Sequence, residues 1–215
     1  SLEPCCHYGR TPPCTDAIIS AGIEEVHIAT KDPNPDVCSK GIKQLEEAGI
    51  KVHLGELKEE ADQMIEAHAK FIIHKTPFIT AKFAMTLDGK IATSSNDSKW
   101  ISGEAARNHV HELRSYSDAI LVGINTLLQD DPQLTSRLKD DYELNQQPIR
   151  VVVDSNLRIP IDAKIFSEPG KNLIATLEKS EKSQKIQNMY DNTEILLVPE
   201  LNGRVNLTSL MQRLG

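Results

Sequence analysis

The sequence lacks any long hydrophobic run and is poor in aromatic residues. Its apolar runs, such as residues 71–73 and 119–122, are only a few residues long, whereas a helix that spans a bilayer needs about 20. Aromatic residues make up 4% of the 215 residues, while hydrophobic residues reach 39% and charged residues 26%. Such a composition can bury a core and shows no low-complexity bias. We therefore expect a globular protein that does not cross a membrane.

The sequence also lacks an excess of positive charge. It contains 24 Lys and Arg against 31 Asp and Glu, which gives a formal net charge of -7. Nonspecific binding of nucleic acid requires a basic face that neutralises phosphates. We therefore expect no nucleic-acid partner, and an anionic small ligand would need arginines placed at its own site.

Cysteine is scarce and unevenly placed. Three of the four cysteines lie within ten residues of one another, and none follows Cys38, which is poor geometry for a disulfide framework. A local cluster in a proline-rich loop is more typical of a metal site in a reducing compartment. The first residues contain neither an initiator Met nor an export signal. We therefore expect a cytoplasmic protein, and we read its first residues as the interior of a domain that begins upstream.

The first 74 residues show the alternation typical of an α/β domain. A helix is expected after Thr11-Pro12-Pro13, with Thr11 as its cap and Gly22 as its stop. Two apolar segments read as strands and two longer amphipathic segments as helices. In chain order these are a strand over 24–30, a helix over 39–48, a strand over 50–54 and a helix over 57–74. The order strand, helix, strand predicts parallel pairing.

The helical pattern breaks at Lys75-Thr76-Pro77, where we place a domain boundary. The chain resumes as an extended run over 78–84 and a polar loop over 93–98. The pattern then predicts a helix over 103–115, a strand over 118–123 with a short helical turn through Leu127, strands over 149–154 and 194–198, and a helix that stops at Gly215. The second half is therefore also α/β.

Two cysteines follow prolines on either side of a tight loop. Cys5 follows Pro4, and Cys14 follows Pro13 at the expected start of a helix. The helix dipole should lower the pKa of the Cys14 thiol and favour the thiolate that a metal needs. Zinc with two sulfur ligands requires a further ligand, typically His, and an open water position if it is catalytic. For two arbitrary cytosolic cysteines, buried free thiols would be the better interpretation; the loop reverses that preference.

The loop as a whole carries a family resemblance. Residues 2–14 read LEPCCHYGRTPPC and resemble the zinc loop of the bifunctional deaminase/reductase of riboflavin biosynthesis. The resemblance implies that Cys5 and Cys14 bind zinc, and that the His ligand and the Glu proton shuttle lie upstream in a His-Ala-Glu motif. None of the seven histidines stands in a His-x-Glu motif, so the deaminase Glu is absent from the chain.

Several neighbouring residues are less specific. The resemblance would place Ser where Cys6 stands, which leaves open a second sulfur ligand or a redox-sensitive neighbour. Cys38 is expected to be a free thiol. Four histidines are expected to be surface or packing residues rather than ligands: His27, His53, His68 and His74.

The resemblance continues through the second half. Residues 82–90 (KFAMTLDGK), 98–102 (SKWIS), 118–123 and 126–137 resemble successive motifs of the reductase domain of the same family. The implied fold is the C-terminal part of a cytidine-deaminase-like zinc domain, residues 1–76, followed by a dihydrofolate-reductase-like reductase domain, residues 77–215. Both domains would be incomplete. The deaminase domain would lack its upstream His-Ala-Glu motif, and the reductase domain would lack the family's Glu-Gly-Gly cofactor loop, which is not found before Gly215.

A reductase of this kind holds a dianionic sugar phosphate. Arg114 and Arg137 can offer the forked donors that phosphate binding favours, although an isolated Arg is more often a solvated surface charge. By resemblance both contact substrate, together with Ser98 and Leu134.

The resemblance implies that the reductase also binds NADP(H). The sequence contains no Gly-x-Gly-x-x-Gly motif, which counts against an ordinary Rossmann domain. Ala84 would let the backbone approach the nicotinamide, Trp100 would supply a flat wall, and Thr126 would open a helix that cradles phosphates. By resemblance Asp130 and Ser155 also touch the cofactor. Lys82 could polarise the reacting carbon and Asp130 could help place it. Core packing is the alternative role for Ala84 and Trp100.

The implied chemistry is sequential. Zinc-activated water would deaminate a diaminopyrimidinone that carries a ribosylamino phosphate, and NADPH would then reduce the ribosyl group to a ribityl side chain. The alternatives are a reductase with a purely structural zinc loop, and a noncatalytic nucleotide-binding protein. A nucleic-acid deaminase conflicts with the acidic balance. The sequence does not fix the oligomeric state, and a homo-oligomer is compatible with it.

Overall fold

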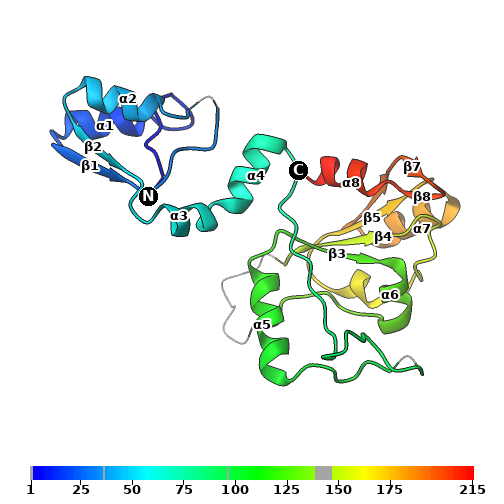
Figure 1. Cartoon of the computed structure of the whole chain (residues 1–215). Coiled ribbons are helices and arrows are strands. Elements are labelled where there is room, and N and C mark those ends of the chain that lie inside the picture. Colours follow the sequence, from blue (N-terminus) through cyan, green and yellow to red (C-terminus); the bar gives the residue numbers. More distant parts are fainter. Residues whose placement is uncertain (1, 36, 96, 139–146) are drawn as a thin grey trace. The chain divides into compact units, whose positions relative to one another are not determined.

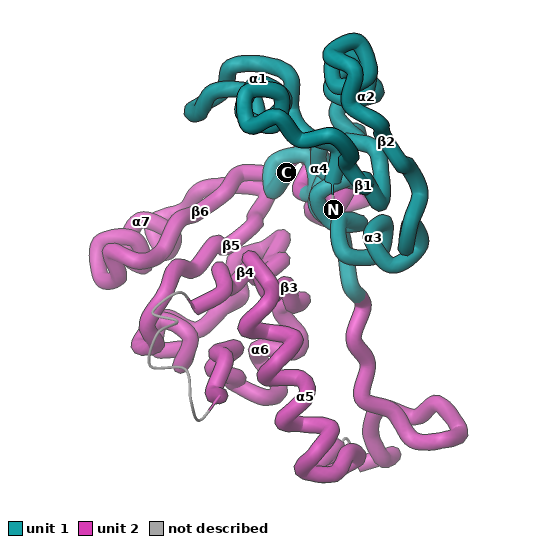
Figure 2. The backbone as a smooth tube through the Cα atoms, turned by 90° about the vertical axis from the view of Figure 1, so that its left-hand side faces the viewer, with its two compact units in different colours: residues 1–80, 211–215 teal, residues 81–210 magenta. Residues whose placement is uncertain are grey.

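The computed structural model describes residues 2–35, 37–95, 97–138 and 147–215. These residues divide into two compact units, coloured separately in Figure 2: residues 1–80 with 211–215, and residues 81–210. Within the described ranges, no helix is long and apolar enough to cross a membrane.

Unit 1 is built on two parallel strands. Strands β1 (Glu25–Ile28) and β2 (Lys51–Leu54) pair in parallel, with His27 opposite His53. Helices α1 (Cys14–Ser20) and α2 (Lys40–Glu47) lie on one side of this pair (Figure 1). The parallel strand–helix–strand order predicted from the sequence is confirmed. Helix α1 begins at Cys14 with Pro13 as its cap, so the prediction of Thr11 as the cap was wrong.

The helix predicted over 57–74 is two helices. Helix α3 (Lys58–Met64) ends and α4 (Glu66–His74) begins at Ile65, whose φ of -106° and ψ of 7° leave the helical region. Helix α3 buries none of its residues and α4 buries none either. Without a buried face to hold the two turns in line, helical periodicity alone does not keep one continuous axis.

Unit 2 contains a four-stranded parallel sheet in the order β3-β4-β5-β6. The strands are β3 (Ala119–Gly123), β4 (Ile149–Val153), β5 (Asn172–Thr176) and β6 (Thr193–Leu197). Its other elements are α5 (Glu104–Ser115), α6 (Ile124–Asp130), a short 3-10 helix η1 (Lys164–Ser167), α7 (Glu181–Met189) and the antiparallel pair β7 (Glu200–Leu201) and β8 (Arg204–Val205). The final helix α8 (Leu207–Leu214) begins in unit 2, and its residues from 211 on are grouped with unit 1. Strands β3, β4 and β6 and the final helix confirm the sequence analysis.

The sheet core is apolar, with one large exception. Val152, Ile174 and Ile186 are fully buried in the cluster around β4 and β5. Arg150 is also fully buried. Its guanidinium donates to Asn172 Oδ1 at 2.7 Å and to the carbonyls of residues 168, 169 and 170 at 3.1, 2.8 and 3.0 Å. A buried charge is tolerated when its donors are satisfied in this way.

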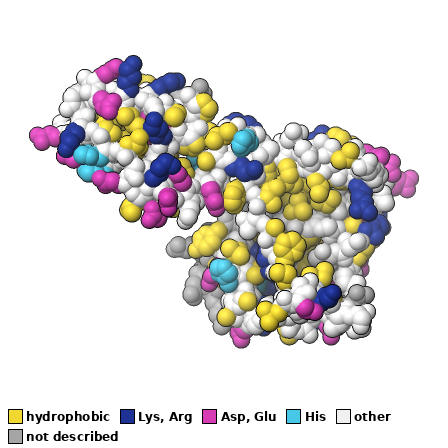
Figure 3. Space-filling view, viewed as in Figure 1, with side chains coloured by type: hydrophobic (Ala, Val, Ile, Leu, Met, Phe, Trp, Pro, Cys, Tyr) yellow, Lys and Arg dark blue, Asp and Glu magenta, His cyan; other side chains and the backbone are white. Residues whose placement is uncertain are grey.

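The segment predicted to be extended over 78–84 forms no strand in the structure. It pairs with none of the strands in the described ranges, and an extended segment without a partner has no ladder of hydrogen bonds to hold it. Large apolar side chains in and after this segment are exposed, among them Phe83, Met85 and Leu87. Figure 3 shows apolar side chains gathered on one face of unit 2.

Candidate functional site

The cysteine loop lies against the start of α2, where a buried carboxylate holds it. Glu3 is 3% exposed, and its two carboxylate oxygens accept hydrogen bonds from four backbone amides. These are the amides of residues 32, 39, 41 and 42, at 3.2, 3.0, 3.1 and 3.3 Å. A Cβ at Gly41 would lie 2.0 Å from the Pro4 carbonyl oxygen, so only glycine lets α2 approach the residue before Cys5.

The structure brings Cys5 and Cys14 together. The Cys14 amide donates to Cys5 Sγ at 3.4 Å, and the Thr15 amide donates to the Cys5 carbonyl at 3.2 Å. A hydrogen bond with Cys5, the like charge of Cys5 and a small loss of hydration raise the pKa of the Cys14 thiol, which is exposed. The sequence analysis expected the helix dipole to lower this pKa, whereas the contacts with Cys5 raise it. Two adjacent sulfurs that resist joint ionisation are a donor pair that a divalent cation stabilises.

A tetrahedral zinc site needs four ligands, of which Cys5 and Cys14 could be two. In the part of the chain that the structure describes, no His, Asp or Glu joins them in a three-ligand group. Cys6 is half-buried, and Cys38 is exposed and free, as expected.

In unit 2 the structure brings Arg114 and Arg137 close enough for their charges to interact. Arg114 lies near the end of α5, and its Nη1 donates to the Thr135 carbonyl at 3.1 Å. Burial and the neighbouring charge of Arg137 lower the pKa of Arg114. Leu134, which precedes Thr135, is buried and has a φ of 54°. A leucine in the left-handed region costs energy and is held there only by its surroundings.

His111 is a member of this cluster that the sequence analysis missed. Burial, followed by the charges of Arg114 and Arg137, lowers the pKa of His111. Its Nδ1 is buried and has no hydrogen-bond partner among the described residues. The spacing of three residues between His111 and Arg114 on one predicted helix could have indicated a shared face. We refer to His111, Arg114 and Arg137 as the basic cluster.

A hydroxyl-bearing loop completes the surroundings of the basic cluster. Ser136 Oγ donates to the His111 carbonyl at 3.1 Å, and the Ser136 amide donates to Gln147 Oε1 at 2.9 Å. These hydrogen bonds, with that of Arg114 to the Thr135 carbonyl, hold the loop over 134–136 against α5 and so position the backbone of Arg137. Two guanidinium groups and an imidazole in one place favour an anion with several oxygens, such as phosphate.

The proposed cofactor residues lie in two places. Thr126 in α6 follows β3 and Ser155 follows β4; because β3 and β4 are parallel with Gly123 opposite Val153, both residues lie at the carboxyl edge of the sheet, where ligands of open α/β sheets bind. The Ser155 hydroxyl accepts from the Val205 amide at 3.0 Å, so it also holds the β8 strand.

The other predicted residues are exposed or lie in the segment without regular structure. Ser98, Lys82 and Asp130 are exposed, and Ala84 is half-buried. Among the residues that the structure describes, no hydrogen bond or ion pair joins Lys82 to Asp130. Trp100 is 72% exposed, and the Arg107 guanidinium carbon lies 4.4 Å from its ring centroid. The indole therefore offers one face to a cation and can offer the other to a ligand ring.

Comparison with known proteins identifies the family. The model of the family described as "RibD C-terminal domain" matches residues 77–215. The "Riboflavin biosynthesis protein RibD" of Actinobacillus pleuropneumoniae is 44% identical over 218 residues, which cover 100% of this chain and 56% of that protein. The protein of the same name in Escherichia coli is 38% identical over 224 residues, or 100% of this chain and 60% of that protein. The chain belongs to the RibD family.

Solved RibD structures share the fold. Acinetobacter baumannii RibD superposes with a TM-score of 0.82 at 35% identity, covering 100% of this chain and 57% of that one. A Thermotoga maritima protein, named a diaminohydroxyphosphoribosylaminopyrimidine deaminase/5-amino-6-(5-phosphoribosylamino)uracil reductase, superposes with a TM-score of 0.75 at 36% identity, covering 91% and 60%. The chain thus spans little more than half the length of these RibD relatives, and the resemblance stated from the sequence is confirmed.

Proposed function

We propose that residues 77–215 form part of an NADPH-dependent reductase of dihydrofolate-reductase-like fold that acts on a pyrimidine ribosylamino phosphate. The single observation that carries this proposal is the basic cluster, which gathers two arginines and a histidine beside the turn at Leu134. The match of the same residues to the RibD C-terminal domain supports it.

In this proposal Arg114 and Arg137 bind the phosphate of the substrate. Arg114 is held by its bond to the Thr135 carbonyl, so one edge of its guanidinium is fixed and the rest can meet phosphate oxygens. The lowered pKa of His111 favours the neutral form of its imidazole. A bound phosphate dianion would offset the repulsion from both arginines and favour the protonated ring. Ser98 and Leu134 would line the substrate near this phosphate.

NADPH would supply the hydride that reduces the ribosyl carbon. Ala84 and Trp100 would border its nicotinamide, and Thr126, Asp130 and Ser155 would contact it at the carboxyl edge of the sheet. Lys82 would hold a proton near the carbon that is reduced, with Asp130 placing the reacting group.

We also propose that residues 1–76 are the C-terminal part of a zinc-dependent deaminase domain. The adjacency of Cys5 and Cys14 supports this assignment, since zinc would stabilise both thiolates. Zinc activates water for attack on an amine-bearing ring carbon when it is bound. Here Glu3, Gly41 and Thr15 position the two sulfurs against α2.

The experiment uses the intact protein with the phosphorylated diaminopyrimidinone, with and without NADPH, and identifies the products by mass. We expect a gain of about one mass unit without NADPH, from exchange of an amine for oxygen, and about two further units with it, from addition of hydride and a proton. Reduction without the first gain would indicate a reductase with a structural metal loop. No change under either condition, with no NADPH bound, would contradict the proposal.

A further inference from the structure

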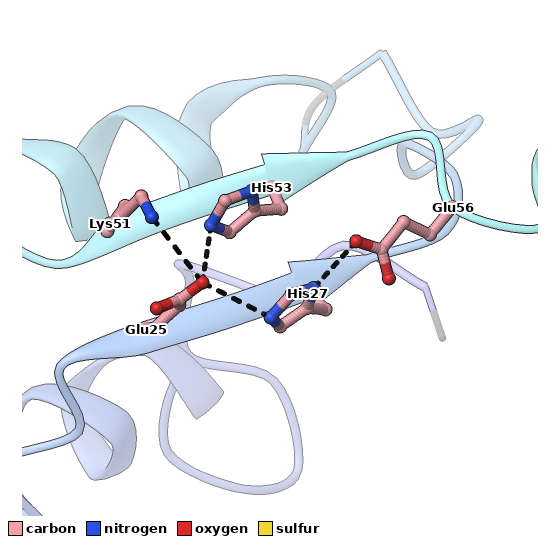
Figure 4. Close-up of polar contacts among 5 residues, drawn as sticks. All are labelled: Glu25, His27, Lys51, His53 and Glu56. Atoms are coloured by element: carbon pink, nitrogen blue, oxygen red, sulfur yellow. Dashed lines mark hydrogen bonds and ion pairs between the residues drawn. The ribbon is translucent and has the colours of Figure 1, made fainter.

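The outer face of the β1–β2 pair carries four polar side chains. Alternate residues of a strand point to the same face, so Glu25 and His27 lie together on β1, and Lys51 and His53 lie together on β2. The parallel register places Glu25 opposite Lys51 and His27 opposite His53. Val26 and the fully buried Ile28 occupy the alternate positions of β1, toward the core. Figure 4 shows the four polar side chains with Glu56.

The carboxylate of Glu25 lies between the two imidazoles. Its Oε1 atom is 3.4 Å from His27 Nε2 and 2.5 Å from His53 Nε2. The two rings stack with centroids 4.6 Å apart and planes 9° from parallel. His53 Nε2 is buried and makes no hydrogen bond of acceptable geometry, despite its closeness to Glu25. Two ring nitrogens and one carboxylate oxygen therefore converge, all within 4.8 Å of one another.

This set of atoms fits a transition-metal ion. Zinc binds imidazole nitrogen and carboxylate oxygen at about 2.0–2.2 Å, which places tetrahedral ligands roughly 3.3–3.5 Å apart. The distance from His27 Nε2 to Glu25 Oε1 already has this value, and the contact with His53 needs to lengthen by about 1 Å. The lone pairs lie in the ring planes, which are 9° from parallel, so binding one ion also requires an imidazole ring to rotate out of the stack. Two imidazoles and one carboxylate are a ligand set that suits zinc and its neighbours and disfavours magnesium and calcium.

A separate contact orients His27 in the way a ligand is oriented. Its Nδ1 lies 2.9 Å from Glu56 Oε1, which follows β2. A carboxylate at Nδ1 fixes the proton on that nitrogen and turns the lone pair of Nε2 toward Glu25. Metal-bound histidines almost always carry such a partner on the second nitrogen. Lys51, at 3.7 Å from Glu25 Oε1, forms only a solvent-exposed ion pair that a divalent cation would displace.

We propose that Glu25, His27 and His53 bind a divalent transition-metal ion of the zinc type, with Glu56 orienting His27 and water completing the coordination. The site ties β1 to β2 and is distinct from the cysteine loop. The proposal revises the expectation that His27 and His53 are ordinary surface residues. The sequence of each strand alone could not reveal that the two histidines lie opposite each other.

Cobalt(II) is the probe, because thiolate ligands give it an intense near-ultraviolet charge-transfer band that nitrogen and oxygen ligands do not. The intact protein, stripped of metal by a chelator, is dialysed against Co²⁺. We expect the total amount of bound cobalt to exceed the amount that the thiolate band accounts for, and the difference is a second fraction with nitrogen and oxygen ligands. This second fraction should persist in a Cys5→Ser, Cys14→Ser variant, which removes the sulfur site.

The second fraction should lose at least tenfold in affinity in His53→Gln, and about 10- to 100-fold in Glu56→Ala. His109→Gln is the matched control, because His109 Nδ1 is also exposed and lies 2.9 Å from a glutamate, Glu112, without a second imidazole; it should bind cobalt as the unchanged protein does. Circular dichroism verifies that each variant is folded. Cobalt binding confined to the thiolate band, or equal loss in His53→Gln and His109→Gln, would overturn the proposal.

Discussion

Two arginines lie close together in unit 2. Arg114 and Arg137 repel each other, since the charge of Arg137 contributes to the lowered pKa of Arg114. A protein keeps such repulsion when a bound anion offsets it. Sequence reasoning found both arginines through their motifs, but it did not find His111, because its role depends on burial and on two charges from different segments.

Replacing Arg114 by Ala should weaken binding of the phosphorylated substrate. The loss of a charged hydrogen-bond donor costs about 1.5–3 kcal/mol, roughly a 10- to 150-fold rise in KM. Steady-state kinetics of the reduction measure it. Arg204→Gln, at an exposed arginine in β8, is the control and should leave KM unchanged. Equal KM values for the two variants would remove Arg114 from the phosphate site.

The imidazole of His111 should titrate below 6.5, the ordinary pKa of histidine, because burial and two arginines disfavour its charged form. Its contribution to folding stability is present above pH 6.5 and is lost as pH falls through the lowered pKa, where the unfolded chain binds the proton more readily. An NMR titration of the ring protons measures the pKa directly. Adding inorganic phosphate should raise it, and no movement with phosphate would contradict the proposed anion site.

At the level of elements, the sequence predicted what local patterning determines. Strands β1 to β4 and β6 follow apolar segments bounded by turn residues, and the parallel pairing of β1 with β2 follows from strand–helix order. The break at Ile65 and the absence of a strand partner for the extended run over 78–84 among the described strands were not predicted. Each depends on packing partners that periodicity does not contain. Strand β5 was missed because NLIAT is a short run between a glycine loop and the polar helix α7.

The anchoring of α2 by Glu3 also escaped the sequence analysis, since the contact joins residues 36 to 39 positions apart. Glu3→Ala should destabilise the start of α2 by about 1.5–3 kcal/mol, because buried amides lose a charged acceptor. Amide hydrogen exchange of residues 39, 41 and 42 reports the change. Glu47→Ala, which removes an exposed ion pair with Lys43 at 3.7 Å, should cost no more than about 0.5 kcal/mol. Similar exchange in the two variants would show that Glu3 is not an anchor.

At the level of the whole molecule, two α/β units carry separate chemistry. Unit 1 presents a pair of sulfurs held against α2, and unit 2 presents a basic cluster and the carboxyl edge of a parallel sheet. Residues 77–215 of this chain match the RibD C-terminal domain. The residues before 77 are also covered by the match to a RibD relative. We keep the division after residue 76 as a proposal, with the compact units separating near residue 80.

The central claim is that unit 2 contributes to hydride transfer onto a sugar phosphate. The most direct measurement gives the intact protein NADPH that carries deuterium at the transferable position, with the deaminated ribosylamino phosphate as substrate, and locates the label in the product by NMR. The account predicts one deuterium on the carbon that was anomeric, and loss of this transfer in Arg114→Ala at low substrate concentration. A reduced product without deuterium at that carbon, or no reduced product at all, would contradict it.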